Sequence, residues 1–123
     1  MPQEQRKGSK NTKTSKDVVV EIFAAGDGVN YPNKGDTVTV HYSGFLPDGT
    51  LFDSSRDRGK PLKFKLGADQ VIPGLDQGIE QLSIGERAKV SIPPELAYGE
   101  KGFLGLVPRN SALIFDLELI TFN

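Results

Sequence analysis

Residues 36–45, DTVTVHYSGF, alternate between apolar and polar side chains with a period of two. Val38, Val40 and Tyr42 fall on one face, whereas Thr39 and His41 fall on the other. This alternation predicts a half-buried β-strand in an antiparallel sheet. Asp48-Gly49 follows shortly afterwards and predicts a tight turn into a second strand at residues 51–53.

The rest of the chain repeats this pattern and breaks it once. Strands are expected at residues 18–25, 62–66, 87–92 and 111–122 from β-branched or alternating apolar residues. Between them, Leu75, Ile79 and Leu82 have helical spacing, with Pro73 in the first turn and Gly85 expected just beyond the helix end. The sequence therefore predicts an α+β domain, a five- to six-stranded antiparallel sheet wrapped around one short amphipathic helix.

The first sixteen residues differ from the remainder in composition. They carry five basic residues and one acid and almost no apolar side chains, whereas residues 17–123 carry ten basic and fifteen acidic residues. We expect residues 1–16 to form a disordered basic tail and residues 17–123 to form the domain. Such a tail either is a solvated leader or contacts nucleic acid, anionic lipid or an acidic partner; the solvated leader is favoured because the tail lacks aromatics and contiguous basic runs.

Composition excludes several classes of site. The chain has no cysteine and a single histidine, His41, so thiol chemistry, a disulfide framework and a Ser-His-Asp triad are excluded. The acids are scattered singly, so no metal site and no cofactor are predicted. No apolar run reaches the length of a membrane span and no signal peptide is visible, which favours a cytoplasmic protein, with the nucleus as an alternative.

One loop is unusually apolar. Residues 98–108, YGEKGFLGLVP, contain Phe103, Leu104, Leu106 and Val107 among three glycines and a proline. Either this loop folds back onto the core, or it forms an apolar rim for a ligand. Buried tyrosines need hydrogen-bond partners, so Tyr42 and Tyr98 together suggest an apolar cavity into which their hydroxyl groups bring polar atoms.

Four segments resemble the FKBP-type peptidyl-prolyl cis–trans isomerases in order and spacing. These are VHYSGFLPDGTLFDSSRDRGKP, KFKLGADQVIPGLDQGI, GERAKVSIPPELAYG and LIFDLEL, and the resemblance extends from about Val18 to Phe122. It implies X–Pro isomerisation in a desolvating apolar pocket, and binding of macrolides such as tacrolimus and rapamycin. The implied partners are proline-containing peptides and proteins, with a phosphatase or kinase reached only through a drug complex.

By position in these motifs, the resemblance also assigns site residues. The Ile72 N–H and the Tyr98 hydroxyl would each donate to a ligand carbonyl, and Asp53 would hold Tyr42 or Arg58. Residues 98–108 correspond to a long flap whose Leu106 and Val107 would lie at the pocket rim, while Phe103 and Leu104 would point outward. The implied catalytic residues are Tyr42, Phe52, Asp53, Tyr98 and Phe115, and the implied ligand-binding residues are Arg58, Leu62, Phe64, Val71, Ile72, Leu75, Leu106 and Val107.

Two positions depart from the family pattern. Leu75 stands where the pocket floor is commonly tryptophan, and Leu62 stands where another aromatic residue is common. Both replacements keep the site apolar but remove flat aromatic surface. A weakly catalytic ligand-binding or chaperone module of the same fold is therefore the alternative to an efficient enzyme, and an adaptor acting through the basic tail is a third. The protein is expected to be a monomer.

Overall fold

The computed structural model describes residues 12–14 and 18–123. The described strands are β1 (Thr12–Thr14), β2 (Val19–Ala24), β3 (Thr37–Phe45), β4 (Leu51–Ser54), β5 (Leu62–Lys65), β6 (Arg87–Ile92) and β7 (Leu113–Phe122). A helix, α1 (Pro73–Glu80), lies between β5 and β6, and a 3-10 turn, η1 (Pro94–Leu96), follows β6. The expected α+β architecture is confirmed.

All strand pairs are antiparallel, in the order β1-β2-β6-β7-β3-β4, and β5 pairs with the first half of β3 beside β4. Six of these strands match the predicted sheet, and the short β1 was not predicted. It pairs Thr12–Thr14 with residues 19–21 of β2. The rest of the predicted basic tail lies outside the described residues, so its disorder stays a prediction.

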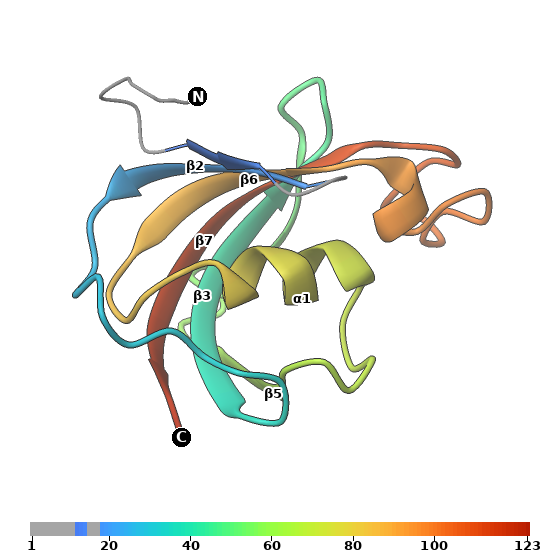
Figure 1. Cartoon of the computed structure of the whole chain (residues 1–123). Coiled ribbons are helices and arrows are strands. Elements are labelled where there is room, and N and C mark those ends of the chain that lie inside the picture. Colours follow the sequence, from blue (N-terminus) through green and yellow to red (C-terminus); the bar gives the residue numbers. More distant parts are fainter. Residues whose placement is uncertain (1–11, 15–17) are drawn as a thin grey trace.

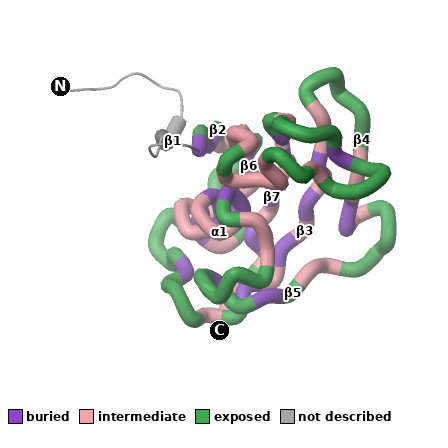
Figure 2. The backbone as a smooth tube through the Cα atoms, turned by 90° about the vertical axis from the view of Figure 1, so that its right-hand side faces the viewer, coloured by how far each residue is buried: buried purple, intermediate pink, exposed green. Residues whose placement is uncertain are grey.

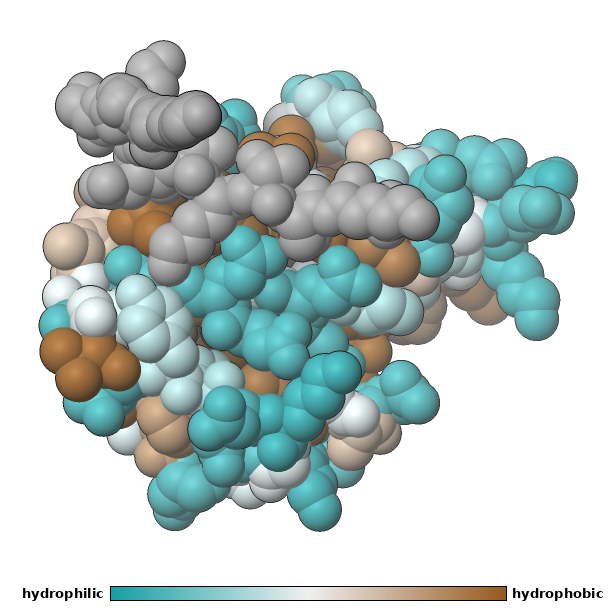
Figure 3. All heavy atoms as spheres, in the orientation of Figure 1, coloured by the Kyte–Doolittle hydropathy of each residue, from teal (hydrophilic) through white to brown (hydrophobic). Residues whose placement is uncertain are grey.

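The helix lies in the concave face of the curved sheet (Figure 1). Alternate residues of β3, β6 and β7 face it and are buried, which is the pattern predicted for Val38, Val40 and Tyr42. Along the backbone, burial concentrates on these central strands and on the inner side of α1 (Figure 2). Ile79 and Leu82 are fully buried in this core. The outer surface seen from the helix side is mostly hydrophilic, with separate apolar areas (Figure 3).

Glycine lets α1 approach the sheet closely. A Cβ atom on Gly74 would lie 2.3 Å from Cγ2 of Ile92, and one on Gly78 would lie 3.0 Å from Cγ1 of Val90. Both side chains belong to β6, so close packing against β6 offsets the low helix propensity of glycine.

The predicted helix end was wrong. The helix begins at Pro73 as expected, but its last residue is Glu80, and Leu82 packs into the core from beyond the helix. Gly85 does not cap the helix. Its φ of 89° serves a later turn, in which its N–H donates to the carbonyl of Leu119. The helical spacing of Leu82 therefore reflected burial rather than helical conformation.

Candidate functional site

Three aromatic rings gather at one end of the inner sheet face. Tyr42 comes from β3, Phe52 from β4 and Phe115 from β7, and the Phe115 ring centroid lies 6.1 Å from that of Tyr42 and 5.8 Å from that of Phe52. A Cβ atom on Gly44 would lie 2.7 Å from Cζ of Phe52 and 2.8 Å from Cε2 of Phe115. Glycine at this position of β3 is thus what allows the rings to pack over the strand.

A polar cluster adjoins these rings, and we call it the Tyr42 corner. The Tyr42 hydroxyl donates to Oδ2 of Asp53 at 2.5 Å and accepts a hydrogen bond from Nη2 of Arg58 at 2.9 Å. Nη1 of Arg58 donates to Oδ1 of Asp53, which closes a triangle of three side chains. The expectation that Asp53 holds Tyr42 or Arg58 is met for both partners at once.

Electrostatics keep each member of this corner in its usual protonation state. Burial alone would raise the pKa of Asp53, but hydrogen bonds from Tyr42 and Arg58, together with the Arg58 charge, outweigh it and lower the pKa. Burial, reinforced by the hydrogen bond to Asp53, raises the pKa of Tyr42. At neutral pH the corner therefore presents a fixed carboxylate and a neutral phenol.

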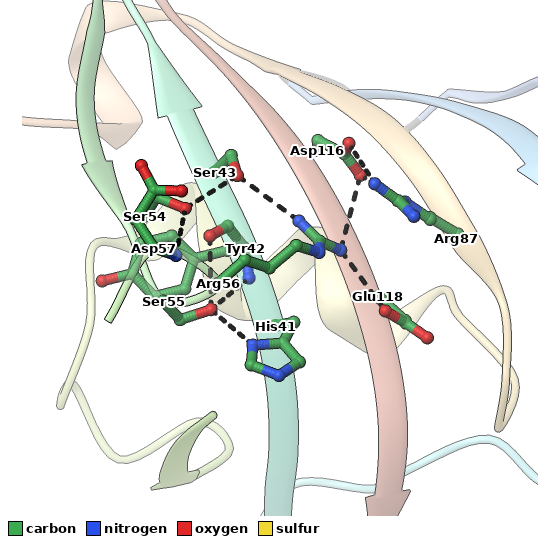
Figure 4. A network of polar contacts seen from close by, with 10 residues as sticks. All are labelled: His41, Tyr42, Ser43, Ser54, Ser55, Arg56, Asp57, Arg87, Asp116 and Glu118. Carbon is green, nitrogen blue, oxygen red and sulfur yellow. Dashed lines mark hydrogen bonds and ion pairs between the residues drawn. The ribbon is translucent and has the colours of Figure 1, made fainter. Parts of the chain in front are cut away.

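A second polar network anchors the segment after β4 to the outer sheet face (Figure 4). The Ser55 hydroxyl lies 2.8 Å from Nδ1 of His41 and accepts a hydrogen bond from the Tyr42 N–H at 2.8 Å. Arg56 reaches Glu118 and Asp116 of β7, with N–O distances of 3.4 and 3.7 Å. Asp53 precedes this anchored stretch and Arg58 follows it, so the network helps to place both.

Ser55 and Arg56 were not among the residues predicted for the site. The sequence carried a signal only for partners of Arg56, because Ser43, Asp116 and Glu118 occupy the polar positions of alternating strands and therefore share the outer face. His41 lies on the polar face of β3 and joins this network through Ser55.

The remaining predicted residues differ in exposure. Phe64, Leu75 and Val107 are buried in the core cluster, and Leu75 is 8% exposed although it stands at the expected pocket floor. Leu62, Val71, Ile72 and Tyr98 are partly buried and pack against that cluster. Leu106, by contrast, is 45% exposed and is not part of the core cluster. Seven of these eight residues thus belong to the core cluster or pack against it, whereas Leu106 does not.

The flap (residues 98–108) combines the two arrangements considered for it. Val107 is buried, and its N–H donates to the carbonyl of Phe103 at 2.8 Å, which closes a small turn. The Phe103 ring stacks on Tyr98 with centroids 5.0 Å apart, so the expectation that Phe103 points outward is only partly correct. Leu104, at 98% exposure, does point outward.

Two hydrogen-bond donors predicted to face a ligand meet no acceptor among residues 12–14 and 18–123. These are the backbone N–H of Ile72, which is the N-cap of α1, and the hydroxyl of Tyr98. Burial, followed by the negative charge of Asp53, raises the pKa of Tyr98, so its hydroxyl stays protonated and able to donate.

Within the described part of the chain, no group of three or more His, Cys, Asp or Glu side chains could hold a metal ion. None of the helices described is long and apolar enough to cross a membrane.

Comparison with known proteins finds relatives that match most of the chain. The family model described as FKBP-type peptidyl-prolyl cis-trans isomerase matches residues 28–120. FK506-binding protein 1 of Debaryomyces hansenii is 56% identical over 104 residues, which cover 85% of this chain and 93% of that protein. Peptidyl-prolyl cis-trans isomerase Fkbp12 of Drosophila melanogaster is 55% identical over 103 residues, which cover 84% and 95% of the two chains.

A solved structure shares the fold. The crystal structure of FkpA from Escherichia coli superposes with a TM-score of 0.82 at 45% sequence identity, covering 91% of this chain. The match takes in 51% of the FkpA chain, so this protein corresponds to about half of it. With the family model matching most of the chain and relatives above half identity along nearly their whole length, the chain belongs to the FKBP-type peptidyl-prolyl cis–trans isomerases.

Proposed function

We propose that this isomerase turns over X–Pro bonds between the aromatic rings of the inner sheet face and the flap. In this assignment Phe52 and Phe115, together with Phe64, enclose the prolyl ring, and Leu75 forms the floor. Tyr42, Asp53 and Arg58 form the polar edge of the site and are held there by their hydrogen bonds to one another. The Ile72 N–H and the Tyr98 hydroxyl each donate to a carbonyl of the substrate, and Val71, Leu62, Leu106 and Val107 supply apolar contacts.

The reaction needs no nucleophile. Rotation about the X–Pro bond meets a barrier of about 18–20 kcal/mol because amide resonance has to be broken. A twisted amide is less dipolar than a planar one, so an apolar site favours the twisted state. Donors that orient the neighbouring carbonyls stabilise this state further, and catalysis is then differential binding of the twisted amide.

The observation that carries the proposal is the pair of donors that find no acceptor in the described part of the chain. Both the Ile72 N–H and the Tyr98 hydroxyl belong to residues that pack against the core cluster containing Tyr42 and Phe115. Partly buried donors gain most from an acceptor when a ligand removes water from them. A ligand with two carbonyl oxygens and an apolar ring satisfies both donors and the aromatic surface together.

The same chemistry extends to macrolides. FK506-binding protein 1 of Debaryomyces hansenii is named for such a ligand. We propose that this chain also binds tacrolimus and rapamycin, acts as a monomer on proline-containing polypeptides, and resides in the cytoplasm, with the nucleus as an alternative. Contact with a phosphatase or kinase through a drug complex is part of this proposal and depends on the exposed flap tip and the segment after β4.

One observation favours a second candidate, the weakly catalytic binding or chaperone module. Leu75 lies in the core cluster and Leu62 packs against it, and because both residues are leucine, neither position offers the flat aromatic surface common in the family. This candidate predicts tacrolimus binding together with slow turnover, whereas the main proposal predicts turnover that tacrolimus abolishes. An adaptor role would involve the basic tail, residues 1–16, and the structure describes only residues 12–14 of that segment.

The test is cis–trans exchange of a Leu-Pro tetrapeptide, measured by NMR with and without tacrolimus. We expect exchange that the drug suppresses, and a fall of about tenfold in kcat/KM for Tyr98→Phe, because one hydrogen bond to the transition state is lost. Phe52→Ala should lower kcat/KM at least as much, since it removes a ring that contacts Phe115.

Phe23→Ala is the matched control for Phe52→Ala, because Phe23 is 59% exposed and lies on β2 outside the site. It should leave exchange unchanged, and thermal unfolding should establish that all three variants are folded. Drug-insensitive exchange in the wild type, or full activity in both folded site variants, would contradict the assignment.

A further inference from the structure

The segment from Arg56 to Lys65 is strongly basic. It holds five cations (Arg56, Arg58, Lys60, Lys63 and Lys65) and one acid, Asp57, although residues 17–123 carry more acidic than basic residues overall. The tube view shows the chain between β4 and β5 as largely exposed (Figure 2). A concentrated positive charge on an otherwise acidic domain calls for an explanation beyond solubility.

Two of these cations already have partners. Arg56 lies beside Asp116 and Glu118 on the outer face, and Arg58 pairs with Asp53 in the Tyr42 corner. Lys60 and Lys63 are exposed, and the described residues form no ion pair with either of them. Their charge is therefore free to act on a ligand.

Both lysines line a surface hollow that begins at the candidate site. Its walls are Arg58, Lys60, Pro61, Leu62 and Lys63. Arg58 belongs to both places, because its Nη2 donates to the Tyr42 hydroxyl at 2.9 Å. Leu62 packs partly against the core and gives the hollow an apolar side.

The backbone holds this hollow in place. Leu62 pairs with Val40 and Lys63 pairs with Thr39 in the β3–β5 ladder. The N–H of Lys60 donates to the carbonyl of Ser55, which the outer network anchors in turn. The backbones of Lys60 and Lys63 are thus held by hydrogen bonds, while their side chains are exposed.

We infer that this hollow is a subsite for an acidic side chain of the prolyl substrate. The inference rests on the proposed function, and it names the substrate class as X–Pro segments with a Glu or Asp within two residues of the proline. An extended chain advances about 3.3–3.6 Å per residue, so such a side chain can leave the prolyl ring and reach the neighbouring hollow. A glutamate lays its methylene groups on Leu62 and its carboxylate between Lys60 and Lys63.

The test is a set of Leu-Pro peptides in which the residue directly before Leu, or one of the two residues after Pro, is Glu, Gln or Lys. Exchange is measured by NMR at low salt with the wild type, the double variant Lys60→Gln/Lys63→Gln and the double variant Lys34→Gln/Lys65→Gln. The last removes the same charge from two exposed lysines that do not line the hollow.

For at least one position, we expect kcat/KM for the Glu peptide to exceed that for the Gln peptide about fivefold, the size of one exposed ion pair. The Lys peptide should be the slowest, and added salt should shrink the preference. In Lys60→Gln/Lys63→Gln the Glu-to-Gln ratio should fall to about one, whereas Lys34→Gln/Lys65→Gln should keep it.

Three results would overturn the inference. Equal turnover of Glu and Gln peptides at every position removes the subsite while leaving the isomerase assignment intact. An equal loss of preference in both double variants would mean that the preference comes from the overall positive charge of the protein surface and not from the hollow. Absence of exchange with every peptide, the neutral Gln peptides included, overturns the proposed function and this inference with it.

Discussion

The Tyr42 corner and the flap contribute to one candidate site but are built in different ways. In the corner, Tyr42 of β3, Asp53 of β4 and Arg58 from the segment after β4 are joined to one another by hydrogen bonds. In the flap, backbone hydrogen bonds fix a small turn, yet its tip residue Leu104 is 98% exposed. The corner is therefore held by bonds between its own side chains, whereas the flap leaves apolar surface exposed at its tip.

The largest expected effect contrasts an aromatic residue from each part. Phe115 is 2% exposed beneath Tyr42 and Phe52, so Phe115→Ala should lower the free energy of unfolding by about 3–5 kcal/mol. Phe103→Ala, in the flap, should cost less than about 1.5 kcal/mol, since Phe103 is 46% exposed and loses mainly its stacking on Tyr98. Urea unfolding of both variants measures the difference, and equal losses would remove the distinction between the two parts.

A smaller effect should appear as a pH dependence of the corner. The pKa of Asp53 is lower in the folded protein than its ordinary value, so its ionised form stabilises the fold above about pH 4. This contribution is lost as the pH falls below about 4 and passes through the lowered pKa of Asp53 in the folded protein. Asp53→Asn should therefore lower Tm at pH 6, and the gap between wild type and variant should narrow towards about pH 2.

Asp48→Asn is the control that separates a role of Asp53 in the site from a general effect of removing a carboxylate with a lowered pKa. The pKa of Asp48 is also lowered, by hydrogen bonds from Thr50, but Asp48 lies in the exposed turn before β4 and away from the corner. It should show no loss of tetrapeptide exchange, whereas Asp53→Asn should show one. A Tm gap for Asp53→Asn that stays constant from pH 6 to about pH 2 would contradict the assignment of the shift to the carboxylate.

The smallest expected effect lies at the flap tip. Leu104→Ser should change the free energy of unfolding by no more than about 0.5 kcal/mol, because the side chain makes almost no contact in the folded chain. Tetrapeptide exchange should also be unchanged, whereas proline-limited refolding of a protein substrate should slow if the tip contacts larger ligands. A loss of stability above about 1 kcal/mol would mean that the tip packs against the domain.

The sequence predicted the central strands because burial there follows a simple period. Val38, Val40 and Tyr42 alternate with polar residues, and a half-buried strand has no other arrangement for them. The helix end was missed because Leu82 is buried from a turn that happens to keep helical spacing. The 3-10 turn and β1 were missed because each is three residues long, too short for a period to show.

The site was partly predictable for a different reason. Short motifs identified Tyr42, Asp53 and Arg58 together, and the structure joins them by hydrogen bonds. The stacking of Phe103 on Tyr98 depends on how the flap turns back at Val107, which no local pattern in the sequence encodes. The outer network of Ser55 and Arg56 depends on which strands become neighbours, and that follows from topology alone.

The position of β7 also has a consequence for synthesis on the ribosome. β7 comes last of the seven described strands but lies between β6 and β3 in the sheet. Until it emerges, β2 and β6 can form one partial sheet and β3, β4 and β5 another, each with an open edge where β7 belongs. Such edges are sites of intermolecular strand pairing. A nascent chain stalled before Leu113 should therefore be more prone to aggregation and proteolysis than the finished domain.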